Sequence, residues 1–355
     1  MAARGFRRTL SPRQSRDESR GNSCVTLRVT AHVVVSHGPT SRLVSKSMDN
    51  PLRHPPGVPR VEKPRAEGQF LLADGRRLGY AEFGDPTGPV VLWFHGTLGA
   101  RRQFLAKGRR AAETLGLRVI VIERPGTGLS DSHRYSSVSE WVADMAQVAD
   151  ALDAEQIGVV GMSGGGPYAL ACGALPPLVD RVAAVGVLDG TVPAVGPEAT
   201  RAGATNIARR FGPILTQLRR PLAVIATILL APLIPFAHYA YRLYMRMWPE
   251  IDRRVLDDPE VEAIFVDDMV NAFRGRCLAM VDDARLLGRD WGFRLVDVKV
   301  PVRWWHGETD HVVPIDGVHT AVARLQDAVL TVRPESHLGG FAMTEEVLAH
   351  MRAQL

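Results

Sequence analysis

The sequence has few cysteines and no secretory leader pattern, and these two absences limit the classes of protein to which it can belong. Its three cysteines, Cys24, Cys172 and Cys277, are far apart and lack the spacing of a metal site. The early arginines are not followed by the apolar run of about 7–15 residues that a secretory signal needs. We therefore expect a reduced, cytoplasmic protein without structural disulfides.

Net positive charge is also missing from most of the chain, although the whole carries +5. Residues 1–47 hold eight Arg and one Lys against two acids, so this end carries +7 and the remainder −2. The basic balance therefore gives no reason to expect nucleic-acid binding by the folded part. We expect residues 1–67 to be a disordered or extended segment, Arg- and Ser-rich to 47 and Pro-rich from 49. Met48 is an alternative start, in which case residues 1–47 are not translated.

Short apolar runs alternate with helix-like segments over the rest of the 355 residues. Such an alternation predicts an α/β fold with a mainly parallel sheet covered by helices on both faces. A hairpin signal at residues 73–75 opens the pattern. The expected strands are 69–72, 77–82, 90–94, 119–122, 157–160, 182–188, 302–305 and 328–332, and the expected helices are 101–115, 137–152, the segment after 165, 315–325 and 344–354.

A serine lies on a predicted strand–turn–helix segment, Ile157–Leu170, which reads IGVVGMSGGGPYAL. Within it Gly161, Met162, Ser163, Gly164 and Gly165 form G-x-S-x-G, a motif that needs this strand and helix context. A nucleophile on so sharp a turn requires small residues two positions before and after it. The pattern predicts that Ser163 is the nucleophile of a tight nucleophile elbow.

An acid and a histidine follow later strands, in the order Ser, Asp, His. Asp310 comes just after the strand that ends near Trp305, and His337 comes after the next strand. Because the carboxyl ends of parallel strands meet at one edge of a sheet, these residues can converge with Ser163. The chemistry requires them, since imidazole must take the serine proton and a carboxylate must hold the ring. Asp189, after another strand, is the alternative acid.

Two backbone N–H groups are expected to form an oxyanion hole. The N–H of Gly164 directly follows the nucleophile, and that of Thr97 directly follows His95-Gly96 at the end of another strand. Such donors stabilise the negative charge that develops on a carbonyl oxygen under attack.

Several motifs together make the chain resemble a serine hydrolase of the α/β-hydrolase fold, over residues 68–355. They are HG-x-x-G, RPG-x-G-x-SD, G-x-SGGGPYALA, G-x-x-D-x-x-VP and an H-x-G-like element, here His95–Gly99, Arg124–Asp131, Gly161–Ala171, Gly307–Pro314 and His337–Gly339. The resemblance implies a catalytic triad and no cofactor or metal, and it does not specify the substrate. It also implies that the core spans 68–189 and 296–355, with a helical lid over 190–295.

The centre of that insertion, residues 221–238, contains no Asp, Glu, Lys or Arg. Its length would suit a membrane span, but Pro232 and Pro235 interrupt the apolar run. We expect a lid over the active site, and we consider peripheral membrane contact and a span as alternatives. The acidic pairs Asp257–Asp258 and Asp267–Asp268 are expected to face solvent.

These features predict an enzyme that cleaves an apolar, small-to-medium ester through an acyl-enzyme. One alternative is an aminopeptidase or amidase, in which a lid carboxylate would bind the substrate ammonium, with Glu260, Glu262 and Asp267 as candidates. Another is a non-catalytic protein that binds a ligand in the lidded pocket. The pattern leaves the oligomeric state open.

Overall fold

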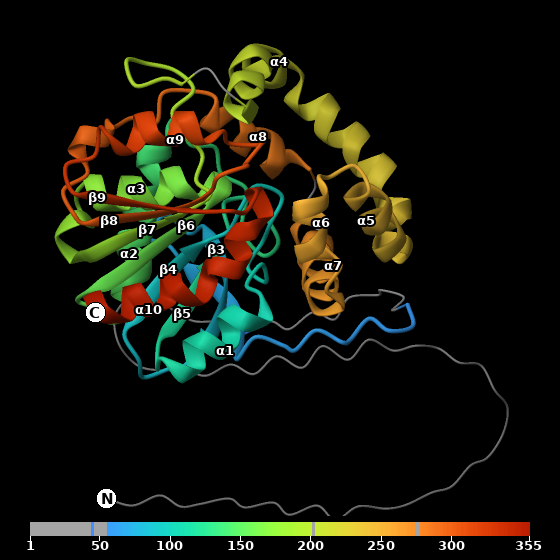
Figure 1. Ribbon diagram of the computed structural model, residues 1–355, viewed down its shortest axis with the longest axis horizontal. Coiled ribbons are helices and arrows are strands. Elements are labelled where there is room, and N and C mark those ends of the chain that lie inside the picture. The colour runs from blue at the N-terminus through green and yellow to red at the C-terminus, as the bar shows by residue number, and fades with distance from the viewer. Residues whose placement is uncertain (1–43, 46–54, 201–202, 274–276) are drawn as a thin grey trace, which may run out of the picture. The chain divides into compact units, whose positions relative to one another are not determined.

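The computed structural model describes residues 44–45, 55–200, 203–273 and 277–355. A nine-stranded sheet forms the centre of the described chain, in the order β1-β2-β3-β5-β4-β6-β7-β8-β9 (Figure 1). Pairing is antiparallel from β1 to β5 along this order and parallel from β5 to β9. The strands are β1 (Val44–Ser45), β2 (Ala66–Leu71), β3 (Arg77–Gly84), β4 (Val90–Phe94), β5 (Arg118–Ile122), β6 (Ile157–Met162), β7 (Val182–Leu188), β8 (Val302–Gly307) and β9 (Ala328–Arg333).

Helices cover both faces of this sheet. The core helices are α1 (Ala106–Thr114), α2 (Trp141–Ala151), α3 (Gly166–Ala174), α9 (Ile315–Val322) and α10 (Thr344–Gln354). One apolar cluster joins α2, α3 and α9 to the sheet, and a second joins α1 and α10 to the opposite face. The mainly parallel α/β arrangement predicted from the sequence is therefore confirmed.

Each central strand supplies both clusters because successive side chains point to opposite faces. Phe94 of β4 packs in the first cluster and its neighbour Trp93 in the second. Trp304 and Trp305 of β8 divide in the same way. A strand buried on both faces is apolar without alternation, which is why these segments appear as continuous apolar runs in the sequence.

Two predicted boundaries were wrong. The helix expected over 101–115 begins only at Ala106, because residues 100–102 bend to present backbone N–H groups to Asp268. The sheet also begins within the N-terminal segment predicted for residues 1–67, since β1 pairs with β2, which itself starts at Ala66. Residues 1–43 and 46–54 lie outside the described residues, so the prediction of disorder there stays a prediction.

A helical segment is inserted between the neighbouring strands β7 and β8. It comprises α4 (Gly203–Leu230), a 3-10 segment (Ala231–Phe236), α5 (Ala237–Met245), α6 (Glu250–Leu256), α7 (Pro259–Phe273) and α8 (Leu278–Leu287). Figure 1 shows α6 and α7 between α5 and the sheet. The stretch Arg220–Met245 has a mean hydropathy of 1.9 and is long and apolar enough to cross a membrane. Only 11% of its 18-residue apolar part is buried within the protein.

Candidate active site

The turn after β6 holds Ser163 in a strained conformation. Its φ is +50°, a left-handed value that a residue with a Cβ seldom adopts. The turn is possible because Gly161 and Gly165 have no side chain. A Cβ at Gly161 would collide with the carbonyl of Gly165, and a Cβ at Gly165 would collide with the carbonyl of Phe94. Met162, the last residue of β6, is buried, whereas Ser163 is only partly covered. The sharp turn thus presents the serine hydroxyl at the carboxyl edge of the sheet.

A chain of hydrogen bonds links three side chains at this edge. Ser163 Oγ lies 3.0 Å from Nε2 of His337, and Nδ1 of His337 lies 2.7 Å from Oδ2 of Asp310. The second carboxylate oxygen of Asp310 accepts the backbone N–H groups of Val312 and Val313, both at 2.8 Å. The acid is thereby fixed on its loop, and it orients the imidazole with one nitrogen facing the serine.

The charges in this chain stabilise one another. Burial lowers the pKa of His337, but the hydrogen bond and negative charge of Asp310 outweigh it, so the net pKa is raised. Burial acts to raise the pKa of Asp310, and the bond and charge of His337 reverse this, so its pKa is lowered. Asp310 therefore stays ionised and His337 is a stronger base than a free imidazole.

Asp189, the alternative acid, occupies a different place. His337 Nδ1 bonds to Asp310, whereas Oδ1 of Asp189 accepts the backbone N–H of Gly307 at 2.9 Å. Burial raises the pKa of Asp189 well above its usual range. Asp189 therefore makes no hydrogen bond to His337 among the bonds described, which favours Asp310 over Asp189 as the acid of the chain.

Asp189, His306 and Asp310 have side-chain atoms close enough to share a metal ion. However, Nε2 of His306 lies 2.8 Å from the carbonyl oxygen of Val313, so this nitrogen carries a proton and donates it to that oxygen in a hydrogen bond. The Asp310 oxygens accept hydrogen bonds from His337 and from backbone amides. Because the Asp310 oxygens and Nε2 of His306 are already used in hydrogen bonds, these two side chains are poor metal ligands.

Thr97 and Gly164 are neighbours in space, as an oxyanion hole requires. A Cβ built on Gly164 would collide with the Thr97 hydroxyl, so a larger residue there would require Thr97 to move. Arg124 holds the Thr97 loop, since its two terminal nitrogens donate to the carbonyls of His95 at 2.6 Å and Gly96 at 2.9 Å. The same guanidinium pairs with Asp283 of α8 at 3.1 Å. The buried Arg124 guanidinium therefore links the Thr97 loop both to the end of β5 and to the inserted segment.

Acidic side chains of the inserted segment also bind the site loops, and the sequence did not predict this. Asp268 on α7 accepts the backbone N–H groups of Ala100 and Arg102 at 2.7 and 2.8 Å, and Asp267 pairs with the Arg102 guanidinium at 2.9 Å. The expectation that Asp267–Asp268 faces solvent was therefore wrong, whereas Asp257–Asp258 is exposed as expected. Burial raises the pKa of Asp268 to about 7.

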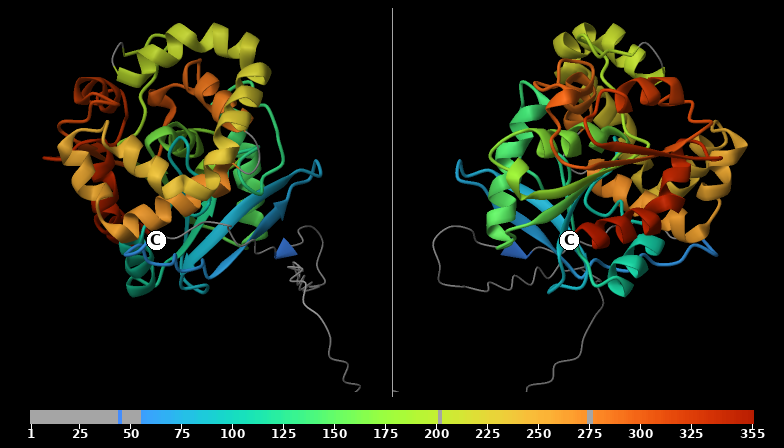
Figure 2. Two further views of the ribbon diagram at one scale, coloured as in Figure 1. Left: turned by 90° about the vertical axis from the view of Figure 1, so that its right-hand side faces the viewer. Right: turned by 60° about the vertical axis from the view of Figure 1, so that its left-hand side comes forward.

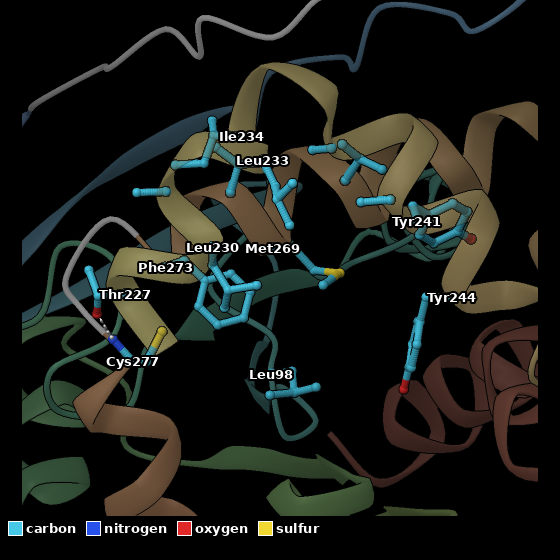
Figure 3. Close-up of a pocket in the computed structure, with 15 residues that line it drawn as sticks. Leu98, Thr227, Leu230, Leu233, Ile234, Tyr241, Tyr244, Met269, Phe273 and Cys277 are labelled. Carbon is cyan, nitrogen blue, oxygen red and sulfur yellow. Dashed lines mark hydrogen bonds between the residues drawn. The ribbon is translucent and has the colours of Figure 1, made fainter. Parts of the chain in front are cut away.

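An apolar cavity of about 350 Å³ lies between the inserted helices and the Thr97 loop (Figure 3). Leu98, directly after Thr97, points into it from one side, and Leu233 and Ile234 lie opposite. Its other lining residues come from the inserted segment and are almost all apolar; they include Leu230, Tyr241, Tyr244, Met269, Phe273 and Cys277. The cavity can therefore accept an apolar chain next to the expected oxyanion donors.

The candidate carboxylates for binding an ammonium group already have cationic partners. Glu262 lies 2.9 Å from His238 and 3.0 Å from Arg242, Asp267 pairs with Arg102, and Glu260 lies 3.5 Å from Arg110. None of the three lines the apolar cavity. These pairings count against an aminopeptidase that uses them.

Comparison with known proteins places this architecture in a family. A family model described as the alpha/beta hydrolase fold matches residues 89–339. No curated protein matches the chain. Among solved structures, an esterase from Exiguobacterium antarcticum has a TM-score of 0.59 at 17% identity, with 80% of this chain and 98% of that chain covered. An esterase from a Rhodococcus species gives 0.58 at 17% identity over 81% and 99%.

A hydrolase from Pseudomonas aeruginosa has a TM-score of 0.58 at 16% identity, with 80% of this chain and 97% of that chain covered. At these identities the structural likeness shows the fold and not the substrate. The family model, in contrast, covers most of the chain and all of the loops described above. The chain therefore belongs to the α/β-hydrolase fold family.

Proposed function

We propose that the protein is a serine hydrolase that cleaves a carboxylic ester of an apolar, small-to-medium substrate. The observation that carries the proposal is the hydrogen-bonded chain from Ser163 through His337 to Asp310, at 3.0 and 2.7 Å, on a turn that holds the serine at φ +50°. Structure-matched esterases support the reaction class.

In the proposed mechanism Ser163 Oγ attacks the ester carbonyl while Nε2 of His337 takes its proton. Asp310 holds the ring and stabilises the imidazolium. The N–H groups of Thr97 and Gly164 bind the oxyanion, where each such donor contributes on the order of 2.7–4 kcal/mol. His337 then gives its proton to the leaving alcohol, and the acyl group remains on Ser163. Water, deprotonated by the same imidazole, releases the acid and restores the serine.

The apolar cavity supports a substrate with an apolar acyl or alkyl group. It is lined by Leu98, Met269 and Phe273 among others, and it adjoins the loop that carries the Thr97 amide. In this role the inserted helices act as a lid. The two described cysteines, Cys172 and Cys277, are free and buried, which agrees with a reduced, cytoplasmic compartment.

The test is labelling of the full chain with a fluorophosphonate probe, wild type beside Ser163→Ala, followed by hydrolysis of p-nitrophenyl esters of increasing chain length. We expect labelling of wild type only and turnover that is lost in the variant. Turnover of aminoacyl arylamides without ester turnover would instead identify a peptidase. A folded wild type that neither labels nor turns over, but binds an apolar ligand, would identify a binding protein.

A further inference from the structure

An exposed apolar face runs along α4, the 3-10 segment and α5 of the inserted segment. Its side chains on α4 recur at helical spacing, so they lie along one side of the helix. They continue on α5 at the same spacing. The exposed residues include Ile214, Leu218, Ile225, Ile228 and Leu229 on α4, and Leu233, Tyr239, Leu243 and Met247 beyond it. Ile228, Leu243 and Met247 are 67%, 65% and 82% exposed.

The opposite side of the same helices is used differently. Ala223 and Tyr241 are buried, and Thr227 and Leu230 line the apolar cavity. These helices therefore have an inner side that packs on the protein and an outer side that the rest of the described chain leaves uncovered. Figure 2 (left) looks onto this outer layer of α4 and α5. A row of exposed apolar side chains of this length marks an interaction surface.

The charge along the segment that carries this face has one sign. Between Glu198 and Glu250 the sequence contains no acidic residue, but it contains seven arginines. Arg210, Arg220 and Arg246 are exposed at the two ends of the apolar stretch. We infer that the α4–α5 face docks on the surface of an anionic lipid bilayer, with its apolar side chains among the acyl chains and its arginines at the headgroups.

The geometry argues against a membrane span. The 3-10 segment with Pro232 and Pro235 divides the apolar stretch, so it is not one continuous helix. His238 is buried beside Glu262 at 2.9 Å, and Tyr241 and Met245 are buried as well. A span would have to expose these groups to lipid, which is costly for the Glu262 carboxylate. The stretch therefore lies on the bilayer surface.

A second copy of the chain is a poorer partner. In a two-fold dimer through this face the same patch meets itself, so the arginines of both copies approach one another. The stretch between Glu198 and Glu250 offers no carboxylate to pair with them. Anionic lipid supplies both the apolar interior and the negative charge.

Vesicle flotation of the full chain tests the inference. We expect the protein to float with vesicles of equal parts phosphatidylcholine and phosphatidylglycerol, and less with phosphatidylcholine alone or at high salt. The double variant Ile225→Asp, Ile228→Asp should bind about tenfold more weakly. Arg220→Glu combined with Arg246→Glu should lose the preference for anionic lipid. Val296→Asp, at a site that is 52% exposed but away from this face, should bind like wild type.

Vesicle flotation does not depend on ester hydrolysis. The membrane inference can therefore fail while the proposed function holds, and the reverse. Ile225 and Ile228 do not line the cavity, and their variant should keep wild-type turnover of a soluble ester, which also shows that it folds. Three results would overturn the inference. They are a wild type that floats with no vesicle, a double variant that floats like wild type, and a wild-type dimer that the double variant converts to monomer without any lipid binding.

Discussion

Asp252 and Asp268 lie on different inserted helices, and each binds a different core loop of the candidate active site. Asp268 accepts the N–H groups of Ala100 and Arg102 in the loop that begins with Thr97. Asp252 accepts the hydroxyl of Ser336 and the N–H of Leu338, both at 2.8 Å, on either side of His337. The inserted segment therefore does more than cover the site, because it also holds two of its loops in place.

Replacing Asp268 with Asn should lower activity. An amide has one acceptor oxygen where the carboxylate has two, so either Ala100 or Arg102 loses its partner. We expect the loop to loosen and kcat/KM for a p-nitrophenyl ester to fall by about tenfold, with a loss of about 1–3 kcal/mol in the free energy of unfolding. Asp257→Asn, at an exposed acid of the same segment, is the matched control. Equal activity of both variants would show that Asp268 does not position the loop.

The same side chain should give stability a distinctive pH dependence. Because the pKa of Asp268 is raised to about 7 in the folded protein, its contribution is fully present below the ordinary pKa of an aspartate, about 3.9, and is lost as pH rises through about 7. The Asn variant lacks this proton. Its deficit in the free energy of unfolding should therefore be larger at pH 5 than at pH 8, as measured by denaturant titration. A deficit that does not change with pH would contradict the raised pKa.

These contacts show where sequence reasoning reaches its limit. The G-x-S-x-G turn is local, so the position of Ser163 at the end of β6 follows from residues next to it in the chain. The parallel sheet then predicts that Asp310 and His337 follow strands at the same edge. Asp268, in contrast, meets Ala100 across 168 residues. The burial of Asp268 depends on how α7 packs against the core, and the residues of α7 alone do not determine that packing.

The sequence nevertheless contained a signal for that burial. Asp267 and Asp268 interrupt an otherwise apolar run between Ala263 and Val270, and both neighbouring turns of α7 face the protein. An acid that shares the apolar side of a helix needs an internal partner. Since any partner would lie far away in the chain, the signal indicates a buried acid but not what it binds.

The choice of acid can be tested by two isosteric variants. Asp310→Asn removes the carboxylate that bonds to His337 and should lower kcat by about 10⁴-fold. Asp189→Asn can keep the bond from the Gly307 N–H, and burial already raises the pKa of the Asp189 carboxyl well above its usual range. We therefore expect it to change kcat by less than about tenfold. The reverse ranking in steady-state assays would assign the acid to Asp189.

The size of the cavity should set the preferred ester. Met269→Trp adds bulk to the lining of the 350 Å³ cavity. We expect kcat/KM for long-chain p-nitrophenyl esters to fall about tenfold or more while acetate turnover is kept, because only the long chain needs the filled volume. Met247→Trp, at a residue that is 82% exposed, should leave the whole profile unchanged. A uniform loss across all chain lengths would mean that the cavity is not the acyl site.

The raised pKa of His337 should govern the pH dependence of the reaction. The imidazole accepts the Ser163 proton only when it is neutral, so kcat/KM should fall as pH drops through a value above the ordinary 6.5 of histidine. In Asp310→Asn the negative charge that raises this pKa is removed, while the burial that lowers it remains. The acidic limb of the variant should therefore move to lower pH, in addition to its loss of rate. The rate of fluorophosphonate labelling across pH measures both effects in the slow variant, since it needs only one attack by Ser163. If the acidic limb of the pH profile of Asp310→Asn coincides with that of wild type, Asp310 does not set the basicity of His337. The role proposed for Asp310 in the mechanism would then be wrong.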